Sequence, residues 1–221
     1  MKTFDIMPTP IGREIYHDND SLKKHTISLI KKERLEWKEK GDDNLFHIES
    51  DRSQGVSFLY KEGLLDFKNW VEEQCTLFVK DVLEYELLDK MIVTDSWINL
   101  CNANGTQHDH YHCNAFISGT YYINYEKEHA PLYFSNPAVS ETVNKIYRPE
   151  ISLRRANKNN KYTGDPLIKP EEGELLLWPS SLSHGHMGNQ KNDRVSISIN
   201  FMPSVVADGL YGFKVTPLRA K

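Results

Sequence analysis

Cysteine is scarce in this chain of 221 residues. The three cysteines, Cys75, Cys101 and Cys113, are too few and odd in number for a disulfide scaffold. A chain of this length can bury a core large enough to fold without such cross-links. The low cysteine content indicates a reducing compartment, so we expect a cytoplasmic protein.

Long apolar runs are also lacking. No segment approaches the roughly 20 apolar residues that a membrane helix needs, so we expect no membrane partner. The N-terminus, Met1 to Asp5, lacks the basic and then apolar order of a signal peptide. A formal net charge of -4 without a basic stripe makes nucleic acid the least favoured partner. The remaining composition, 39% hydrophobic and 26% charged, is that of an ordinary globular protein.

The order of sequence patterns predicts one domain over residues 1–221. Residues 1–90 are expected to form helical support, with helices from about Asn19 to Lys40 and from Leu64 to about Leu88. Residues 91–221 carry short runs of β-branched and aromatic residues, interrupted by a polar insertion over 135–170. Helices followed by many short strands predict a mainly β fold, in which two N-terminal helices pack on an antiparallel sandwich or barrel.

Histidine, by contrast, is abundant, and five of the nine histidines fall in two short clusters. His110 and His112 are two residues apart, so on a strand their imidazoles share one face. His184 is a third imidazole that can complete a facial metal site with open positions. Arg194, ten residues further on, offers a guanidinium fork for a carboxylate. A metal site beside a carboxylate anchor is the equipment of an iron oxygenase that uses a 2-oxo acid.

Side-chain alternation extends this hypothesis to the neighbouring residues. If residues 110–124 form one strand without a bulge, His110, His112 and Tyr122 share a face. The segment from Arg194 to Met202 alternates almost ideally, with Arg194, Ser196, Ser198 and Asn200 on one face. Its apolar residues, Val195, Ile197, Ile199 and Phe201, are expected on the other face, against the core.

Other ligand sets remain open on the residues alone. His108 and His110 can form the metal-binding pair, with His112 beside it. His186 can replace His184, although its spacing to Arg194 fits less well. The cluster can also be a set of surface histidines that captures metal by accident.

The order of motifs resembles the 2-oxoglutarate/Fe(II)-dependent oxygenases of the double-stranded β-helix, or jelly-roll, fold. It is most similar to a group of oxygenases from bacteria and phages. The motifs that carry this resemblance are Trp97-Ile98-Asn99, His110-Tyr111-His112, Ser118-Gly119-Thr120-Tyr121-Tyr122, Trp178-Pro179-Ser180, His184 and Arg194-Val195-Ser196. The resemblance spans nearly the whole chain and is strongest from Trp97 to Phe201.

The resemblance implies a role for each matching position. His110, His112 and His184 would hold Fe(II), and Arg194 would bind the distal carboxylate of 2-oxoglutarate. Hydrogen bonds from Ser196 and Tyr122 would assist, with Asn99 near the cosubstrate. With O2 as the further reactant, the implied outcome is hydroxylation of an unactivated C–H bond with release of succinate and CO2. His112 departs from the wider family, where a carboxylate usually occupies this place.

Two other functions compete with this one. A cupin-type three-histidine dioxygenase would work without 2-oxoglutarate and would not need Arg194 and Ser196. A non-catalytic jelly roll that binds metal or sugar would need no such convergence of histidines and arginine. The substrate cannot be derived from the sequence, although a protein side chain or a small molecule is favoured over nucleic acid. A homodimer formed through the N-terminal helices stays open.

Overall fold

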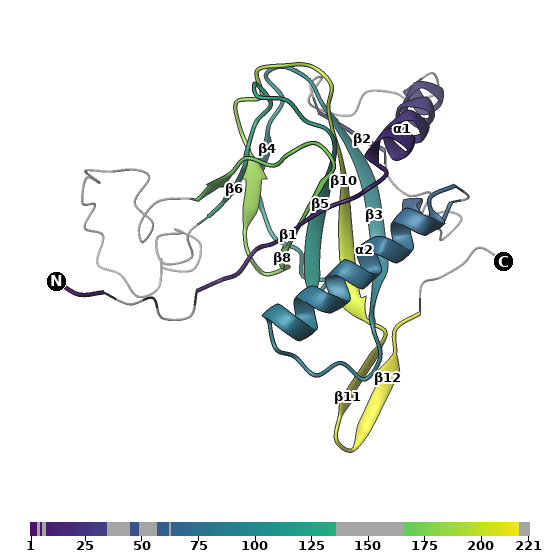
Figure 1. The fold of residues 1–221 in the computed structure, drawn as a ribbon, viewed down its shortest axis with the longest axis vertical. Helices are drawn as coiled ribbons and strands as arrows, with labels where there is room; N and C mark the ends of the chain where they lie inside the picture. Colours follow the sequence, from purple (N-terminus) through teal and green to yellow (C-terminus); the bar gives the residue numbers. More distant parts are fainter. Residues whose placement is uncertain are drawn as a thin grey trace.

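Two antiparallel sheets face each other in the computed structural model, which describes residues 1–3, 5, 8–34, 45–48, 57–61, 63–135 and 166–216 (Figure 1). The larger sheet has the order β1 (Gly12–Ile15), β8 (Glu174–Pro179), β5 (Ile117–Asn124), β10 (Arg194–Pro203), β3 (Met91–Cys101) and β2 (Leu45–Ile48). The smaller sheet has the order β4 (Gln107–His110), β9 (His184–His186), β6 (Leu132–Phe134) and β7 (Leu167–Ile168). This is the expected double-stranded β-helix fold.

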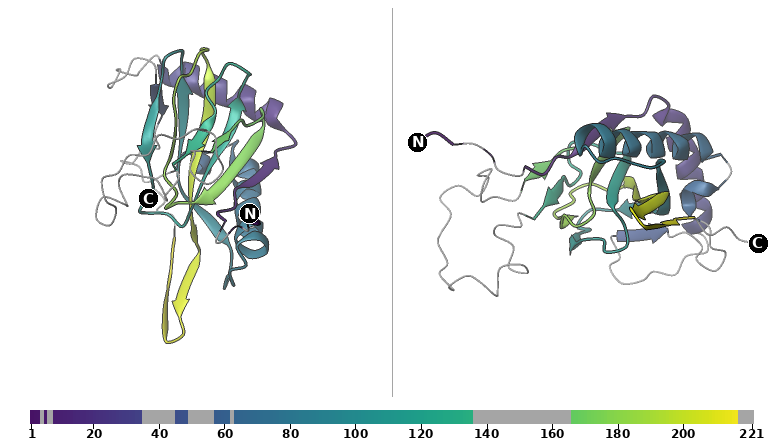
Figure 2. Two further views of the ribbon diagram at one scale, coloured as in Figure 1. Left: turned by 90° about the vertical axis from the view of Figure 1, so that its left-hand side faces the viewer. Right: turned by 90° about the horizontal axis from the view of Figure 1, so that it is seen from below.

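The helices cover the outer face of the larger sheet (Figures 1 and 2). Helix α1 spans Asn19–Arg34 and α2 spans Leu65–Leu77, with a short 3-10 helix, η1 (Phe58–Tyr60), before it. Neither helix in the described part of the chain has the length and apolar character needed to cross a bilayer. The expected second helix ends early, because η2 (Phe78–Val82) is a π-helical turn and Glu84 then adopts a positive φ of 56°. The predicted end of the first helix, near Lys40, lies outside the described residues.

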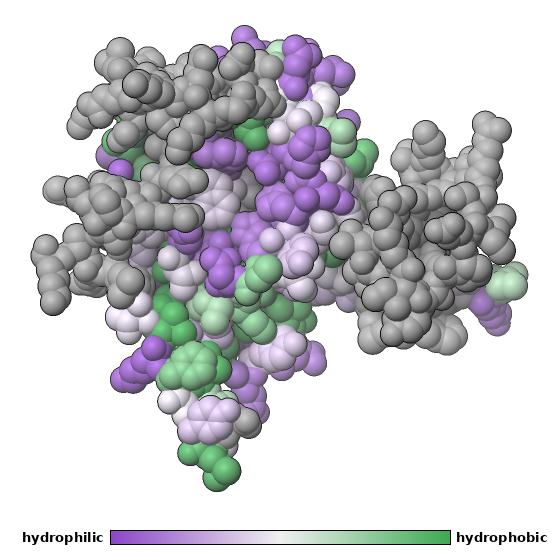
Figure 3. Space-filling view, turned by 180° about the vertical axis from the view of Figure 1, so that it is seen from behind, coloured by the Kyte–Doolittle hydropathy of each residue, from purple (hydrophilic) through white to green (hydrophobic). Residues whose placement is uncertain are grey.

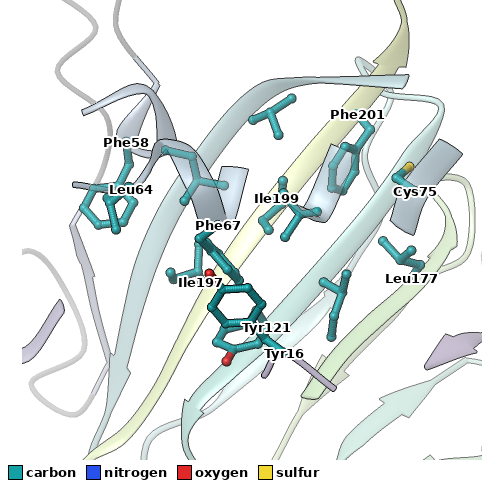
Figure 4. Packing of buried hydrophobic residues seen from close by; sticks show 14 of the residues in the cluster. Tyr16, Phe58, Leu64, Phe67, Cys75, Tyr121, Leu177, Ile197, Ile199 and Phe201 are labelled. Carbon is teal, nitrogen blue, oxygen red and sulfur yellow. The ribbon is translucent and has the colours of Figure 1, made fainter. Parts of the chain in front are cut away.

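The main core lies between α2 and the larger sheet (Figure 4). Phe67, Val71 and Cys75 of α2 pack toward apolar residues of β10 and β5, among them Ile197 and Tyr121. Strand β10 has the predicted alternation, since Val195, Ile197, Ile199 and Phe201 all belong to this cluster. The opposite face of β10 is thereby left to polar side chains, and this face looks toward the smaller sheet. None of the three cysteines forms a disulfide.

Residues 110–124 do not form the single strand on which the expected shared face of His110, His112 and Tyr122 depended. Strand β4 ends at His110, and a turn that includes Cys113 and Asn114 then carries the chain to the other sheet, where β5 begins at Ile117. The register of β4 against β9 also shifts between Gln107 and His110. The assumption was wrong because the fold changes sheets at this point.

The N-terminal part of the chain also contributes to the larger sheet. Strand β1 pairs with β8 at one edge, and β2 pairs with β3 at the other. Most of the expected insertion, residues 136–165, lies outside the described residues, and β7 follows it. After β10, the hairpin of β11 (Val205–Asp208) and β12 (Tyr211–Lys214) projects away from the body of the molecule (Figures 1 and 2).

Candidate metal and cosubstrate site

Three histidines meet between the two sheets. His110, His112 and His184 each offer one ring nitrogen as a possible metal ligand. These three nitrogens all lie within 4.8 Å of one another. The ring centroids are 4.4 Å apart for His110 and His184, 5.2 Å for His110 and His112, and 5.3 Å for His112 and His184. The structure therefore brings together the three histidines that the sequence singled out.

Strand pairing explains how two of the histidines meet. His110 lies directly opposite His184 in the antiparallel pair of β4 and β9. Opposite residues in such a pair have neighbouring side chains on the same face, so the two imidazoles are brought together by register alone.

His112 reaches the same point from the turn after β4. Its backbone N–H donates to the Ser180 carbonyl at 3.0 Å, which fixes the turn. Its ring is stacked on Trp97, with centroids 5.7 Å apart and planes 15° apart, and is hydrogen-bonded to the Asn200 side chain. Asn200 is in turn held by Ser118, whose hydroxyl donates to Asn200 Oδ1 at 3.1 Å. The third imidazole is thus oriented by β3, β5 and β10 together.

The hydrogen bonds of the three imidazole rings leave one nitrogen of each ring available to bind a metal. Nδ1 of His110 donates to the His108 carbonyl, and Nδ1 of His184 donates to the Leu182 carbonyl, both at 2.9 Å. With Nδ1 protonated, the lone pair of a neutral imidazole is on Nε2. Nε2 of His112 is buried and has no hydrogen-bond partner among the described residues.

Burial keeps two of these rings neutral. Desolvation, opposed by the bond to Leu182, lowers the pKa of His184 to about 3. Desolvation and the neighbouring His110 also lower the pKa of His112, against the effect of Asn200. Neutral imidazoles are the form that binds a metal, so no proton has to be displaced at these two positions near pH 7.

Arg194 lies at the far end of the same cavity, on the polar face of β10. It is 2% exposed, and its Nε donates to the Ala130 carbonyl at 3.2 Å. Its guanidinium carbon lies 5.2 Å from the centre of the Tyr122 ring. Among the described residues no carboxylate forms a salt bridge with Arg194, so a buried cation faces the cavity without a protein anion.

Tyr122 lies beside Arg194 and is fully buried. Desolvation, opposed by Arg194, raises the pKa of Tyr122 to about 12, so its hydroxyl stays protonated at neutral pH. Its neighbour Arg194 can only donate hydrogen bonds, so the hydroxyl proton has no acceptor among the described residues. Ser196 is also buried and lines the cavity from β10.

Both the oxygen and the nitrogen of the Asn99 side-chain amide form hydrogen bonds within the protein. Its Oδ1 accepts from His47 Nδ1 at 2.6 Å, and its Nδ2 donates to the Ser198 hydroxyl at 2.8 Å. His47 lines the cavity from the edge strand β2, which pairs with β3. His47 could not be found from the sequence, because the four residues of β2 give little local signal of a strand.

The cavity has a volume of about 360 Å³ and is lined by both sheets. It contains every site residue that the sequence predicted: Asn99, His110, His112, Tyr122, His184, Arg194 and Ser196. The two alternative metal ligands, His108 and His186, differ in their position relative to the cavity. His108 is exposed and does not line the cavity, whereas His186 is 6% exposed and lines it without belonging to the three-histidine cluster.

His186 projects into the cavity from the residue two after His184. Its Nδ1 is buried and has no hydrogen-bond partner among the described residues. Desolvation lowers the pKa of His186 to about 2, with further contributions from Arg194 and His47, so this ring is neutral as well.

Comparison with known proteins connects this geometry with one family. A family model described as "Putative 2OG-Fe(II) oxygenase" matches residues 95–200, which include all the predicted site residues. No curated protein matches the chain in sequence.

Solved structures resemble the chain in fold. A prolyl-4-hydroxylase from Pseudomonas putida is 10% identical, with a TM-score of 0.54 over 87% of this chain and 92% of its own. HygX from Streptomyces hygroscopicus, solved with nickel and 2-oxoglutarate bound, is 11% identical, with a TM-score of 0.54 over 89% and 84%. The α-ketoglutarate-dependent epimerase SnoN is 9% identical, with a TM-score of 0.54 over 96% and 87%. At these identities the likeness is one of fold.

Proposed function

We propose that this chain is an Fe(II)- and 2-oxoglutarate-dependent oxygenase that hydroxylates an unactivated C–H bond, since residues 95–200 match the model of a family described as "Putative 2OG-Fe(II) oxygenase". One observation carries the proposal: three imidazoles that can bind a metal and a buried arginine without a protein anion share one cavity. A metal site alone would fit many enzymes, whereas the arginine calls for an anionic ligand beside the metal.

The donor set fits Fe(II). We assign His110, His112 and His184 as the ligands, because each has a nitrogen available and imidazole binds Fe, Zn, Cu and Ni alike. A three-histidine set carries one negative charge less than the commoner set of two histidines and a carboxylate. This favours binding of an anionic cosubstrate, while it weakens the attraction for the metal itself.

The far end of the cavity fits the distal carboxylate of 2-oxoglutarate. Arg194 would supply a bidentate, charge-assisted contact, which is strong when it is buried. The protonated Tyr122 hydroxyl and the Ser196 hydroxyl lie on the same polar wall. HygX, a neighbour in fold, was crystallised with nickel and 2-oxoglutarate and also with iron, which agrees with this assignment.

When bound, Fe(II), 2-oxoglutarate and O2 supply the oxidation, with succinate and CO2 as the products of the cosubstrate. The chain's own residues would hold these groups and keep bulk water away. Trp97 stacked on His112 and Trp178 packed against His184, with ring centroids 4.8 Å apart, limit the movement of two ligands. Asn200 and the Leu182 carbonyl hold the orientation of the same two rings.

The substrate and setting are proposed from composition. A net charge of -4 disfavours nucleic acid, so we propose a protein side chain or a small molecule as substrate. None of the three cysteines forms a disulfide, which agrees with a reducing cytoplasm. SnoN, a neighbour in fold, is an α-ketoglutarate-dependent epimerase, so identification of the product would decide between hydroxylation and another reaction.

An anaerobic titration tests the proposal. Metal-free protein receives Fe(II) and then 2-oxoglutarate, and the visible charge-transfer band of the chelate is recorded. We expect the band in the wild type, its loss in His184→Ala, and its shift to higher 2-oxoglutarate concentration in Arg194→Ala. His108→Ala is the matched control and should behave as the wild type, because its side chain lies outside the cavity.

The alternatives predict other outcomes in the same titration. Metal binding without a band at any 2-oxoglutarate concentration would support a cupin-type dioxygenase that needs no 2-oxo acid. Absence of metal binding would leave only the non-catalytic jelly roll. Loss of the band in His108→Ala would restore His108 as a ligand.

A further inference from the structure

His186 has no place in the metal site, yet it is buried in the cavity. It is 6% exposed, and Gly185 separates it from His184 on β9, so the two imidazoles share one face of the strand. Its Nδ1 has no hydrogen-bond partner among the described residues, and it is not part of the three-histidine cluster. A buried polar atom without a partner is rare in a folded protein and calls for an explanation.

Two further groups near His186 share this situation. The Tyr122 hydroxyl is buried without an acceptor for its proton among the described residues, because its neighbour Arg194 can only donate, and Arg194 is buried without an ion pair there. All three line one cavity, and Arg194 is among the charges that act on the His186 ring. The protein thus places three polar side chains from β5, β9 and β10 around one end of the cavity.

The chemistry of these groups identifies the ligand that they fit. A guanidinium and a protonated tyrosine hydroxyl both donate hydrogen bonds, and a neutral imidazole can donate one from Nδ1. Three donors without a protein acceptor between them fit a group that only accepts, and a carboxylate accepts with both oxygens. A cationic ligand would be repelled by Arg194, and a neutral carbonyl would offer one accepting oxygen instead of two and no charge to pair with the guanidinium.

We propose that His186 donates from Nδ1 to the distal carboxylate of 2-oxoglutarate and helps to select a dicarboxylic over a monocarboxylic 2-oxo acid. This inference rests on the proposed function and extends it to a residue that decides cosubstrate specificity. It also explains why a second histidine follows His184 without joining the metal site.

Two amide substitutions form a matched pair for the test. In His186→Asn the side-chain amide can place its nitrogen where Nδ1 lies, whereas in His186→Gln the amide reaches one atom further. His186→Leu removes the donor and keeps a side chain of moderate size. The probes are 2-oxoglutarate and 2-oxopentanoate, which has the same chain length but lacks the distal carboxylate. The readout is the dissociation constant of each from the anaerobic Fe(II) chelate band.

The expected result is a selective loss. His186→Leu and His186→Gln should bind 2-oxoglutarate about 10- to 100-fold more weakly, because a hydrogen bond to a charged group is lost. Binding of 2-oxopentanoate should stay unchanged, and His186→Asn should recover most of the affinity for 2-oxoglutarate. The Fe(II) affinity of all three variants should equal that of the wild type, which also reports that the site is folded.

Three results would overturn the inference. Wild-type affinity for 2-oxoglutarate in both His186→Leu and His186→Gln would show that no such bond exists. An equal loss for both 2-oxo acids, or a loss of Fe(II) binding, would show that His186 supports the metal site instead. A wild-type protein that binds neither 2-oxo acid would overturn the proposed function, and this inference with it.

Discussion

Glu72 on α2 binds two lysines and a backbone amide. Its side chain is 2% exposed, with Oε1 2.8 Å from Lys68 Nζ and Oε2 2.8 Å from Lys90 Nζ. The Val93 N–H also donates to Oε1, at 3.2 Å. Burial alone raises the pKa of Glu72, but the bonds from Lys68, Lys90 and Val93 outweigh it, so the pKa is lower than usual. This carboxylate ties α2 to the start of β3, the strand that carries Trp97 and Asn99.

We predict that Glu72→Gln lowers the free energy of unfolding by about 3 kcal/mol at pH 7, since it leaves Lys68 buried without its anion. Because the folded pKa is depressed, the contribution of Glu72 is complete above its unfolded pKa of 4.5 and is lost as pH falls through the folded pKa. Urea unfolding of both proteins at pH 7 and at pH 3 measures this. The exposed Glu73→Gln is the control, and an equal difference at both pH values would contradict the prediction.

The sequence offers candidate site residues where residue type and spacing carry the chemistry. His110, His112, His184 and Arg194 could be singled out because few residue types bind metals or carboxylates; the structure places all four on one cavity, and their roles remain predictions. His47 could not, because it reaches the cavity only through the pairing of β2 with β3. The prediction that Asn99 lies near the cosubstrate remains a prediction, although its amide is already bonded to His47 and Ser198.

At the scale of elements, the proposed metal site depends on close packing of β9 against its neighbours. Gly185 lies between the two inward-facing histidines of this strand. A methyl group there would overlap the Gln107 carbonyl oxygen of β4 and lie 2.9 Å from the Tyr133 hydroxyl. The backbone of β4 cannot yield without shifting His110, so the absence of a side chain at residue 185 keeps His110 and His184 adjacent.

We therefore predict that Gly185→Ala separates β9 from β4 and weakens Fe(II) binding by about 10-fold or more, with a stability loss of about 1–3 kcal/mol from overpacking. Isothermal titration with Fe(II) under anaerobic conditions measures the first effect, and urea unfolding measures the second. Met187→Ala, on an exposed side chain two residues further on, should change neither. Unchanged Fe(II) affinity in Gly185→Ala would show that the sheet accommodates the added methyl group without moving β9 away from β4, and would contradict this prediction.

The elements differ in how well local sequence predicts them. The segment that becomes β10 could be predicted because its alternation directly reflects a core on one side and the cavity on the other. The change of sheet between β4 and β5 could not be predicted. The alternating residue pattern continues through this segment, although the chain turns at Cys113 and Asn114. The π-helical turn after α2 likewise has apolar residues at helical spacing, so periodicity does not reveal it.

At the scale of the whole molecule, the buried core that stabilises the fold and the exposed apolar side chains of the hairpin lie in different parts of the protein. Phe201 of β10 is fully buried in the main core, between the sheet and α2. Phe213 is 55% exposed and Leu210 98% exposed on the projecting hairpin, at the end of the molecule where hydrophobic residues are visible (Figure 3).

We predict that Phe201→Ala lowers the free energy of unfolding by about 3–5 kcal/mol, because it removes a buried ring and leaves a cavity. Phe213→Ala should change it by less than about 0.5 kcal/mol, because that ring is half exposed on a two-stranded hairpin. Urea unfolding monitored by tryptophan fluorescence compares the two variants. A large loss in Phe213→Ala would indicate that the hairpin contacts more of the protein in solution.

The cavity between the two sheets has a consequence for the folding equilibrium. His110 and His184 belong to the smaller sheet, whereas Arg194 and Tyr122 belong to the larger one. A 2-oxoglutarate molecule that chelates the metal and binds Arg194 would be a non-covalent cross-link between sheets that the chain otherwise joins by packing and connecting turns. At 100 times its dissociation constant such a ligand stabilises the native state by about 2.7 kcal/mol. 2-Oxopentanoate lacks the carboxylate that would bind Arg194, so at the same concentration it should bind more weakly and raise the melting temperature of the iron-loaded protein less than 2-oxoglutarate does.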